Sequence, residues 1–372
     1  MPPDNDVIDS VSERIRAAAA AGTPLRIRGG GTKDFYGQSL EGGILDMTPY
    51  AGVTSYEPSE LVVTARAGTP LAELEALLAA QGQCLPFEPP YFDAPGLRAT
   101  VGGMVASGLS GPARASVGAV RDYVLGLKLI NGRGELLTFG GQVMKNVAGY
   151  DVSRLMAGAL GTLGVLTEVS LKVLPVAPAE ATLRFECGQA QALDWLNAWG
   201  GLPLPLNASC WVEEAGSGTL HVRLRGAVAA VDAACKTLGG EKKDNRESTG
   251  YWQACRDQQH PWFQARQAGQ DLWRLSVPQT AAVLDLPDSP LVEWHGAQRW
   301  VRADAGQAQA LRAAALQAGG HATLFIAAGA HSTGATARFD ALKPPLDRIH
   351  RELKREFDPA GILNRGRMAA GW

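Results

Sequence analysis

The sequence predicts an α+β protein built from two dissimilar parts. Short runs typical of β-strands alternate with amphipathic helical runs along the whole chain. Glycine makes up 44 of the 372 residues, well above the usual ~7%, and it is concentrated before residue 170. Eight of the nine tryptophans lie between residues 180 and 330. We therefore expect a glycine-rich domain at 1–175, an α+β domain with an antiparallel sheet at 180–330, and a C-terminal helix and tail at 340–372.

The first part is expected to open with a helix and continue as short strands. Ser10 and Glu13 have the spacing of a capping box, so we expect the first helix to begin there and run through the alanines that follow. Pro70 is typical of the first turn of a helix, and Gly82 of its end. Asn131 and Gly132 predict a hairpin turn. The strands expected in this part are 25–28, 44–47, 61–66, 124–130, 135–139 and 163–174.

The second part begins after a boundary marked by Pro175 and Pro178. A strand–helix–strand–strand–helix order is expected from 182 to 238, and a similar order from 272 to 326. The polar stretch 236–256 is expected to be a surface excursion. Apolar residues at helical spacing predict a last amphipathic helix at 344–357.

Composition excludes several classes of protein. The net charge of −2 argues against sequence-independent binding to nucleic acid, because such binding depends on an excess of positive charge. The five cysteines are widely spaced, which argues against a disulfide framework or an iron–sulfur site and fits a reducing cytosol. No apolar run approaches ~18 residues, so no transmembrane helix is expected. The acidic N-terminus is unlike a secretory signal. We therefore expect a cytoplasmic protein.

A glycine run follows the first expected strand. Gly29, Gly30 and Gly31 would let several backbone N–H groups converge on one point, which suits a pyrophosphate. Thr32 and Lys33 can add a hydroxyl and a positive charge. The spacing matches neither GxGxxG nor the P-loop. On this motif alone, an ordinary glycine-rich turn is equally expected.

Two further glycine segments extend the pattern. Gly102 and Gly103 have no side chains and leave the backbone accessible, so a flat ring or a diphosphate could lie against them. Tight packing of a helix on a sheet is the alternative explanation for this segment. Gly161 and Gly164 belong to a tight turn that can offer backbone groups to the edge of a heterocycle.

Together these segments resemble the flavin-binding domain of the vanillyl-alcohol oxidase (PCMH-type) family, over roughly residues 1–175 and 358–367. Within that family they are most similar to the FAD-binding subunits of bacterial glycolate oxidases. The matching segments are Arg28-Gly-Gly-Gly-Thr-Lys33, Thr100-Val-Gly-Gly103, Ser110-Gly-Pro112, Arg121-Asp-Tyr-Val-Leu-Gly126, Lys145-Asn146, Gly149-Tyr-Asp151, Gly161-Thr-Leu-Gly164 and Phe357-Asp-Pro-Ala-Gly-Ile-Leu-Asn364.

The resemblance implies an FAD-binding domain of two subdomains, a cap domain, and a tail that returns to the FAD domain. It also implies that FAD binding is non-covalent, because the first glycine loop lacks the histidine that often holds FAD covalently in this fold. The residues that it assigns to FAD are Arg28, Gly29, Gly30, Gly31, Thr32, Lys33, Thr100, Val101, Gly102, Gly103, Ala106, Ser107, Gly111, Gly161, Thr162, Gly164, Val165 and Asn364.

The sequence departs from the catalytic members of the family at three places. Ala159 and Leu160 replace a Ser-Glu pair, and Arg365 replaces a proline in the tail. The C-terminal His-x-Gly-Asp-Gly-Asn-x-His segment is also missing, and its nearest counterpart runs from Ala328 to His331. The resemblance therefore implies a subunit that supports oxidation of glycolate, with D-lactate as a second substrate, while a homologous flavin subunit carries out the hydroxy-acid chemistry. An iron–sulfur subunit and peripheral association with the inner membrane through these partners are implied as well.

The sequence indicates few candidates for catalytic residues. Oxidation of a 2-hydroxy acid needs a base for the hydroxyl proton and a cation for the carboxylate. His331 and Lys145 are the two weak candidates, and Arg114 and Arg121 are further cations expected near the flavin, although ordinary ion pairing explains them as well. The other histidines, including His350 on the last helix, are expected to pack or to lie on the surface. No residue pattern suggests a metal.

Two alternatives stay open. The chain could be a self-sufficient FAD-dependent dehydrogenase with an unrecognised base, although the missing histidine motif counts against this. It could also be a non-catalytic assembly subunit with a vestigial FAD site. The intact glycine loops count against that alternative. In a site that no longer binds FAD, neutral mutations would have replaced some of these glycines with residues that carry side chains.

Overall fold

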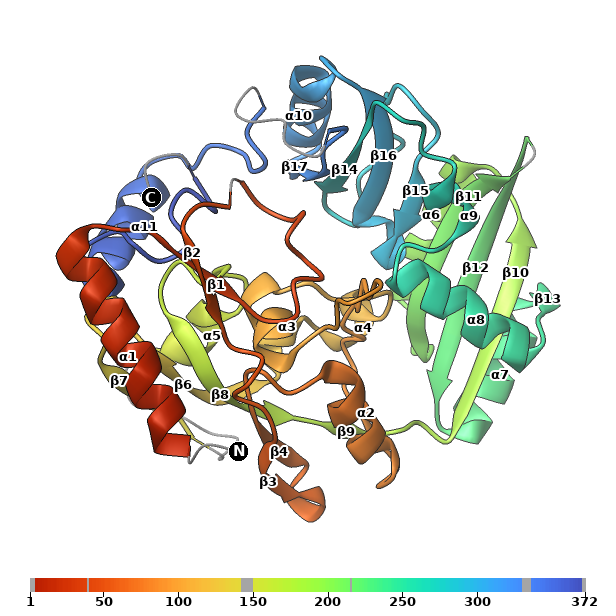
Figure 1. Ribbon diagram of the computed structural model, residues 1–372. Coiled ribbons are helices and arrows are strands. Elements are labelled where there is room, and N and C mark those ends of the chain that lie inside the picture. The colour runs from red at the N-terminus through yellow and green to blue at the C-terminus, as the bar shows by residue number, and fades with distance from the viewer. Residues whose placement is uncertain (1–3, 39, 142–149, 215, 330–335, 370–372) are drawn as a thin grey trace. The chain divides into compact units, whose positions relative to one another are not determined.

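The computed structural model describes residues 4–38, 40–141, 150–214, 216–329 and 336–369 (Figure 1). The chain forms two compact units. The first unit consists of Met1–Leu109, Ala119–Pro175 and Ala341–Trp372, and the second of Ser110–Gly118 and Val176–Asp340. Both units combine helices with mainly antiparallel sheets, which confirms the predicted α+β class.

One part of the first unit is built on a short parallel strand pair. Strands β1 (Leu25–Arg28) and β2 (Gly43–Asp46) pair in parallel, and Leu25 also bridges to Leu363 of the C-terminal tail. Helix α1 (Asp4–Ala21) packs on this pair through Ile15, which is fully buried together with Leu363. The tail therefore belongs to the core beneath β1 rather than to the surface.

The other part of the first unit is a five-stranded antiparallel sheet in the order β3-β4-β8-β6-β7. Helices α2 and α3 pack against one another, and α3 packs on β4 and β8. The strand bounds are β3 Val53–Glu57, β4 Val62–Arg66, β6 Val124–Ile130, β7 Leu136–Gly140 and β8 Val165–Lys172, with a small β5 (Gln83–Cys84) and β9 (Leu174–Pro175) pair. The helices are α2 Leu71–Ala79, α3 Val101–Ser107, α5 Val152–Met156 and α11 Leu346–Phe357.

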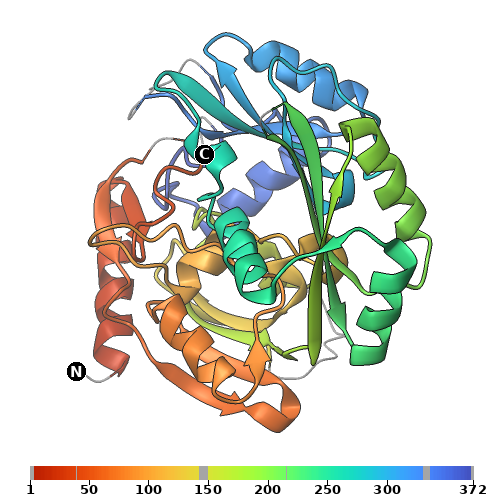
Figure 2. The same ribbon diagram turned by 90° about the vertical axis from the view of Figure 1, so that its right-hand side faces the viewer.

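The second unit is an eight-stranded sheet in the order β13-β10-β12-β11-β15-β16-β14-β17. Helices α6 and α7 cover one face of this sheet and α8 covers the other (Figure 2). The strands are β10 Ala179–Glu186, β11 Leu206–Glu214, β12 Ser217–Gly226, β13 Glu241–Lys242, β14 Gln270–Ser276, β15 Leu291–Glu293, β16 Gln298–Asp304 and β17 His321–Ile326. The helices are α6 Gln189–Gly200, α7 Val228–Leu238, α8 Asn245–Arg256, α9 Pro261–Gln264 and α10 Ala308–Gln317.

A short segment from the N-terminal half of the chain belongs to the second unit. Ser110–Gly118 contains α4 (Arg114–Val117), which contacts β11. The Trp294 indole N–H donates to the Gly111 carbonyl at 3.0 Å, and the Arg114 guanidinium lies 4.5 Å from the centre of the Trp294 ring. Trp294 adopts a φ of 55°, which is costly for a bulky residue, so this local packing holds it in place.

Three local predictions are wrong. The order expected from 272 to 326 differs from the observed order, which is β14, β15, β16, α10 and β17. Ser10 lies inside α1 rather than at its start, because the helix already runs from Asp4. Residues 245–256 form α8 rather than an irregular excursion, because Trp252 and Cys255 are buried against the sheet. This helix is amphipathic, and its short apolar stripe is difficult to recognise in the sequence among the many polar residues of the exposed face.

Candidate functional site

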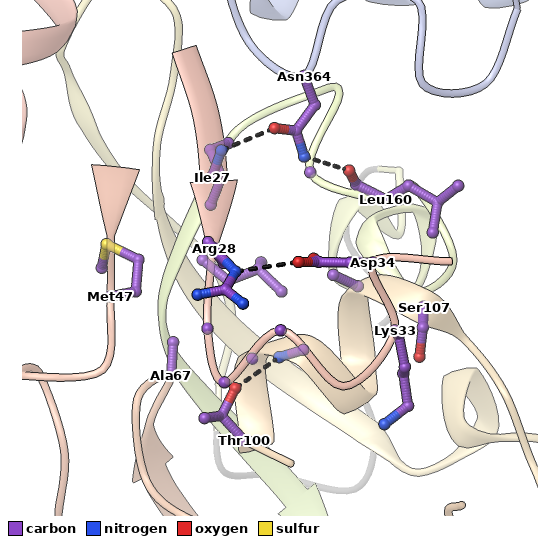
Figure 3. A pocket seen from close by; sticks show the side chains of 18 of the residues that line it. Ile27, Arg28, Lys33, Asp34, Met47, Ala67, Thr100, Ser107, Leu160 and Asn364 are labelled. Carbon is purple, nitrogen blue, oxygen red and sulfur yellow. Dashed lines mark hydrogen bonds and ion pairs between the residues drawn. The ribbon is translucent and has the colours of Figure 1, made fainter. Parts of the chain in front are cut away.

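The first unit contains a cavity bounded by the first glycine loop, which we call the glycine-loop cavity (Figure 3). Its empty volume is about 810 Å³ when the part open to solvent is counted, within the range of about 300–1,000 Å³ typical of ligand sites. Much of the wall comes from β1 with its glycine loop, α3, the turn at 157–164 and the C-terminal tail, and Leu40, Met47, Ala67 and Leu166 complete it.

The glycine loop presents backbone donors to this cavity. In the described part of the chain, no hydrogen bond is formed by the N–H groups of Gly29, Gly30 and Gly31. Gly31 has a φ of 75°, and a Cβ on Gly30 would lie 1.5 Å from the Arg98 carbonyl oxygen. Only glycine fits this path, and three successive N–H groups without a partner are suited to the kind of nest that binds an anion.

The two glycines of α3 have different roles. A Cβ on Gly102 would lie 2.7 Å from the Cβ of Ala67, so this glycine is required for packing. A Cβ on Gly103 would meet only the Thr100 hydroxyl, at 3.1 Å. Thr100 caps the helix, accepting a hydrogen bond from the Gly103 N–H at 3.2 Å. Gly103 therefore leaves space in the cavity rather than in the core.

Asn364 ties the tail to two walls of the cavity. Its Oδ1 accepts a hydrogen bond from the Ile27 N–H at 2.7 Å, and its Nδ2 donates to the Leu160 carbonyl at 2.6 Å (Figure 3). A Cβ on Gly161 would lie 2.7 Å from Nδ2. One amide thus fixes β1 against the 157–164 turn, and the close approach requires glycine in the turn.

Charged groups surround the glycine loop. The Asp34 carboxylate pairs with Arg28 at 3.0 Å and also with Arg26. The Lys33 ammonium donates to the Thr32 hydroxyl and to the Tyr91 carbonyl, both at 3.2 Å. A positive charge beside backbone donors suits an anionic ligand such as a diphosphate.

Arg367 is a site residue that the sequence did not indicate. It is 5% exposed, and its guanidinium donates to the carbonyls of Gln38 at 2.8 Å, Lys33 at 3.1 Å and Asp34 at 3.0 Å. It therefore holds the segment after the glycine loop. Its position three residues beyond Asn364 was the only signal, and no local pattern distinguishes it from the exposed Arg365.

Most of the residues assigned to FAD come together at this cavity. Those that line it are Arg28, Gly29, Gly30, Gly31, Thr32, Lys33, Thr100, Gly102, Gly103, Ala106, Ser107, Gly161, Gly164 and Asn364. Val101, Thr162 and Val165 instead have fully buried side chains. Gly111 lies in the second unit, where its carbonyl accepts the Trp294 hydrogen bond. Lys145 and His331 lie outside the described residues.

Four of the six histidines are held in the second unit in environments that disfavour the charged form. Burial lowers the pKa of His221, His260 and His295 to about 4, and it also lowers the pKa of His321. His295 contacts the hydroxyls of Ser116 at 2.9 Å and Ser209 at 3.1 Å. Burial therefore keeps this imidazole neutral at pH 7.

Among the described residues, no group of three or more His, Cys, Asp and Glu side chains is arranged to hold a metal ion. No helix in the described ranges is both long and apolar enough to cross a membrane.

Comparison with known proteins defines the class first. Residues 6–140 match the FAD binding domain family, and this range contains the glycine loop and α3. An alkyldihydroxyacetonephosphate synthase in two crystal forms gives TM-scores of 0.62 and 0.63 at 15% identity, covering 95% of this chain and 74% of that one. The first unit thus has an FAD-binding domain of the predicted PCMH type, and the predicted cofactor, FAD, is confirmed.

The chain is 44% identical to the glycolate oxidase subunit GlcE of Escherichia coli over 98% of both proteins. It belongs to the family of that subunit. The glycolate oxidase subunit GlcD of Bacillus subtilis is 28% identical over 47% of this chain and 37% of its own length. A D-lactate dehydrogenase of Anaerostipes hadrus is 33% identical over 39% of this chain and 30% of its own length. The predicted family is confirmed.

The glycine-loop cavity fits the cofactor of this family on physical grounds. FAD carries a pyrophosphate, and the three unbonded N–H groups beside Lys33 match its charge and its acceptors. Gly103 leaves open the space that a Cβ would occupy. The cavity volume is also adequate for a large ligand that stays partly exposed.

Proposed function

We propose that this chain is the FAD-binding subunit of a glycolate oxidase complex, which oxidises glycolate to glyoxylate and accepts D-lactate as a second substrate. The observation that carries the proposal is the 44% identity with GlcE over 98% of both chains. An intact cofactor cradle at Gly29–Gly31 and Gly103 supports an active role. It counts against an assembly subunit with a vestigial site.

The chain's own residues would hold FAD without a covalent bond. The N–H groups of Gly29, Gly30 and Gly31 would bind the pyrophosphate, with Lys33 supplying positive charge. Asn364 and Arg367 would fix the geometry of the walls before the cofactor arrives. When bound, FAD supplies a two-electron acceptor that can pass its electrons onward.

We assign the hydroxy-acid chemistry to the partner flavin subunit. Oxidation of glycolate removes two electrons and two protons, and one of these protons needs a base. The carboxylate in the cavity wall, Asp34, is paired with Arg26 and Arg28. The cavity therefore supplies binding and orientation, and the chain serves as an electron relay. An iron–sulfur subunit would accept the electrons, and the complex would sit at the periphery of the inner membrane.

Dye-linked oxidation of glycolate tests this division of labour. The purified chain, the partner flavin subunit and the complete complex are assayed with glycolate and an artificial electron acceptor. We expect no turnover with the chain alone and turnover with the complex that falls when the cradle variant Gly103→Leu is incorporated. Turnover by the isolated chain would show a self-sufficient dehydrogenase, and unchanged turnover of the complex with Gly103→Leu would refute the relay role.

A further inference from the structure

A second cavity of the first unit is also lined by residues of the 157–164 turn. Its empty volume is about 660 Å³, with part open to solvent. We call it the Arg121 cavity. Among the described residues that line it, Arg121, Arg154 and His350 are the basic ones and none is acidic. The other lining residues are Leu155, Ala157, Gly158, Ala159, Thr162, Leu163, Leu353 and Met368.

Arg121 gives this cavity an uncompensated positive charge. Within the described structure, its guanidinium takes part in no hydrogen bond or ion pair. Its Nη2 lies 4.0 Å from the point where a Cβ on Gly158 would be, so the charged end lies against the turn. A guanidinium in this position has its donors free for an external acceptor, and it matches a carboxylate in a two-point geometry.

Arg154 makes a smaller contribution. Its Nε lies 3.0 Å from Oδ2 of Asp151, and both side chains are about half exposed, at 50% and 53%. Asp151 therefore offsets much of the charge of Arg154 before any ligand arrives. The excess charge of the cavity comes from Arg121.

The position of the Arg121 cavity links it to the cofactor site. Leu160, Gly161 and Gly164 line the glycine-loop cavity, whereas Ala157–Ala159, Thr162 and Leu163 of the same turn line the Arg121 cavity. A single turn of backbone thus forms a wall of both. An anion bound by Arg121 would lie within one turn of the cofactor's own wall.

We propose that the Arg121 cavity binds a small carboxylate anion of the 2-hydroxy-acid class, with Arg121 as the residue that holds the carboxylate. Leu155, Leu163 and Leu353 form an apolar wall beside the charge, which leaves room for the methyl group of lactate. The inference deepens the proposed function and rests on it for the choice of ligand. It gives the chain a contact of its own with the substrate class, although the hydroxy-acid chemistry is carried out by the partner.

Titration calorimetry of the full-length chain with glycolate tests the proposal without any need for turnover. We expect saturable binding that acetate displaces. Arg121→Gln should raise the dissociation constant tenfold or more, because a charge-assisted pair is lost. Arg154→Gln should have a smaller effect. The matched control is Arg348→Gln, since Arg348 is 73% exposed and lies outside both cavities, and it should change the dissociation constant less than twofold.

Three outcomes would overturn the proposal: no saturable binding of glycolate, equal affinity of wild type and Arg121→Gln, or sulfate binding as tightly as glycolate. The last would show a general anion site. Because Arg121 has an exposed side chain without internal partners, its replacement should leave the unfolding midpoint unchanged. The FAD content of each sample is read separately from its visible absorption. Glycolate binding by a chain that cannot hold FAD would refute the proposed function and leave the carboxylate site standing.

Discussion

The ammonium of Lys354 lies 2.6 Å from Oδ2 of Asp358, and both side chains are buried, at 7% and 0% exposure. Lys354 also donates to the Thr162 carbonyl at 2.8 Å and to the Leu363 carbonyl at 2.9 Å. The Asp358 carboxylate accepts the N–H groups of Ile362 at 3.2 Å and Leu363 at 2.8 Å. This one ion pair therefore joins α11, the 157–164 turn and the tail that carries Asn364.

Replacing Lys354 should damage both stability and cofactor binding. Burial lowers the pKa of Lys354, and the charge of Asp358 opposes that effect. Lys354→Met would leave the Asp358 carboxylate buried without its cation, which costs about 3–5 kcal/mol in comparable cases. We expect a loss of that order in denaturant unfolding, together with weaker FAD binding. The double variant Lys354→Met/Asp358→Asn should recover part of the lost stability. If it is no more stable than Lys354→Met, the ion pair does not stabilise the fold as described.

Gly103→Leu should remove FAD without unfolding the chain. The new side chain would enter the glycine-loop cavity, and its Cβ would meet only the Thr100 hydroxyl. The purified variant should lack flavin absorption while its denaturation midpoint stays close to that of the FAD-free wild type. Gly43→Leu is the matched control, because Gly43 is exposed and a Cβ there has no neighbour within 4 Å. Stoichiometric flavin in Gly103→Leu would show that the cradle is assigned wrongly.

Arg367→Met should speed the release of FAD. The change removes three hydrogen bonds to the carbonyls of Gln38, Lys33 and Asp34. Leaving these partly buried acceptors without a donor costs up to about 1–3 kcal/mol. We expect a tenfold or greater rise in the FAD dissociation rate, measured by the recovery of flavin fluorescence. Arg365→Met, a change in an exposed neighbour, should leave the rate unchanged, and equal effects of the two variants would refute a specific role for Arg367.

The second unit should lose stability in mild acid. His221, His260 and His295 have pKa values of about 4 in the folded chain, against about 6.5 when unfolded. The unfolded state therefore binds protons first, so the free energy of unfolding falls as the pH drops from about 6.5 towards 4. Tryptophan fluorescence in denaturant at several pH values measures this slope, because eight of the nine tryptophans lie between residues 195 and 300.

His260→Asn isolates one of these contributions. The His260 Nδ1 accepts the Trp262 N–H at 3.2 Å and caps α9, and asparagine can cap a helix without titrating in this range. The variant should show a shallower loss of stability between pH 6.5 and 4 than the wild type. Identical slopes would mean that His260 is not kept neutral by the fold.

The sequence was sufficient to predict the features that depend on local chemistry. Gly29–Gly31 after a strand, and the matching segments at Thr100 and Gly161, pointed to a cofactor cradle, and these residues line one cavity. The strand and helix order from 182 to 238 is the order observed as β10, α6, β11, β12 and α7. Hydrophobic periodicity and turn residues are short-range signals, so they can be read without knowing the fold.

Features that depend on distant contacts could not be predicted. Lys354 and Arg367 lie in charged stretches typical of a solvated face, and only the return of the tail beneath β1 buries them. Ser110–Gly118 follows α3 closely in sequence but packs with the second unit, and Gly111 is not among the residues that line the cavity. Thr162 was assigned to the cofactor from its motif, whereas its carbonyl accepts Lys354 and its side chain is fully buried.

The central claim is that this chain holds FAD in the glycine-loop cavity and leaves the oxidation of glycolate to a partner. An anaerobic visible spectrum of the purified chain, recorded before and after glycolate is added, tests it most directly. We predict flavin bands at one FAD per chain that persist when glycolate is present. Bands that bleach with glycolate would show that the chain oxidises the substrate itself, and a chain without flavin after incubation with FAD would contradict the assignment of the cavity.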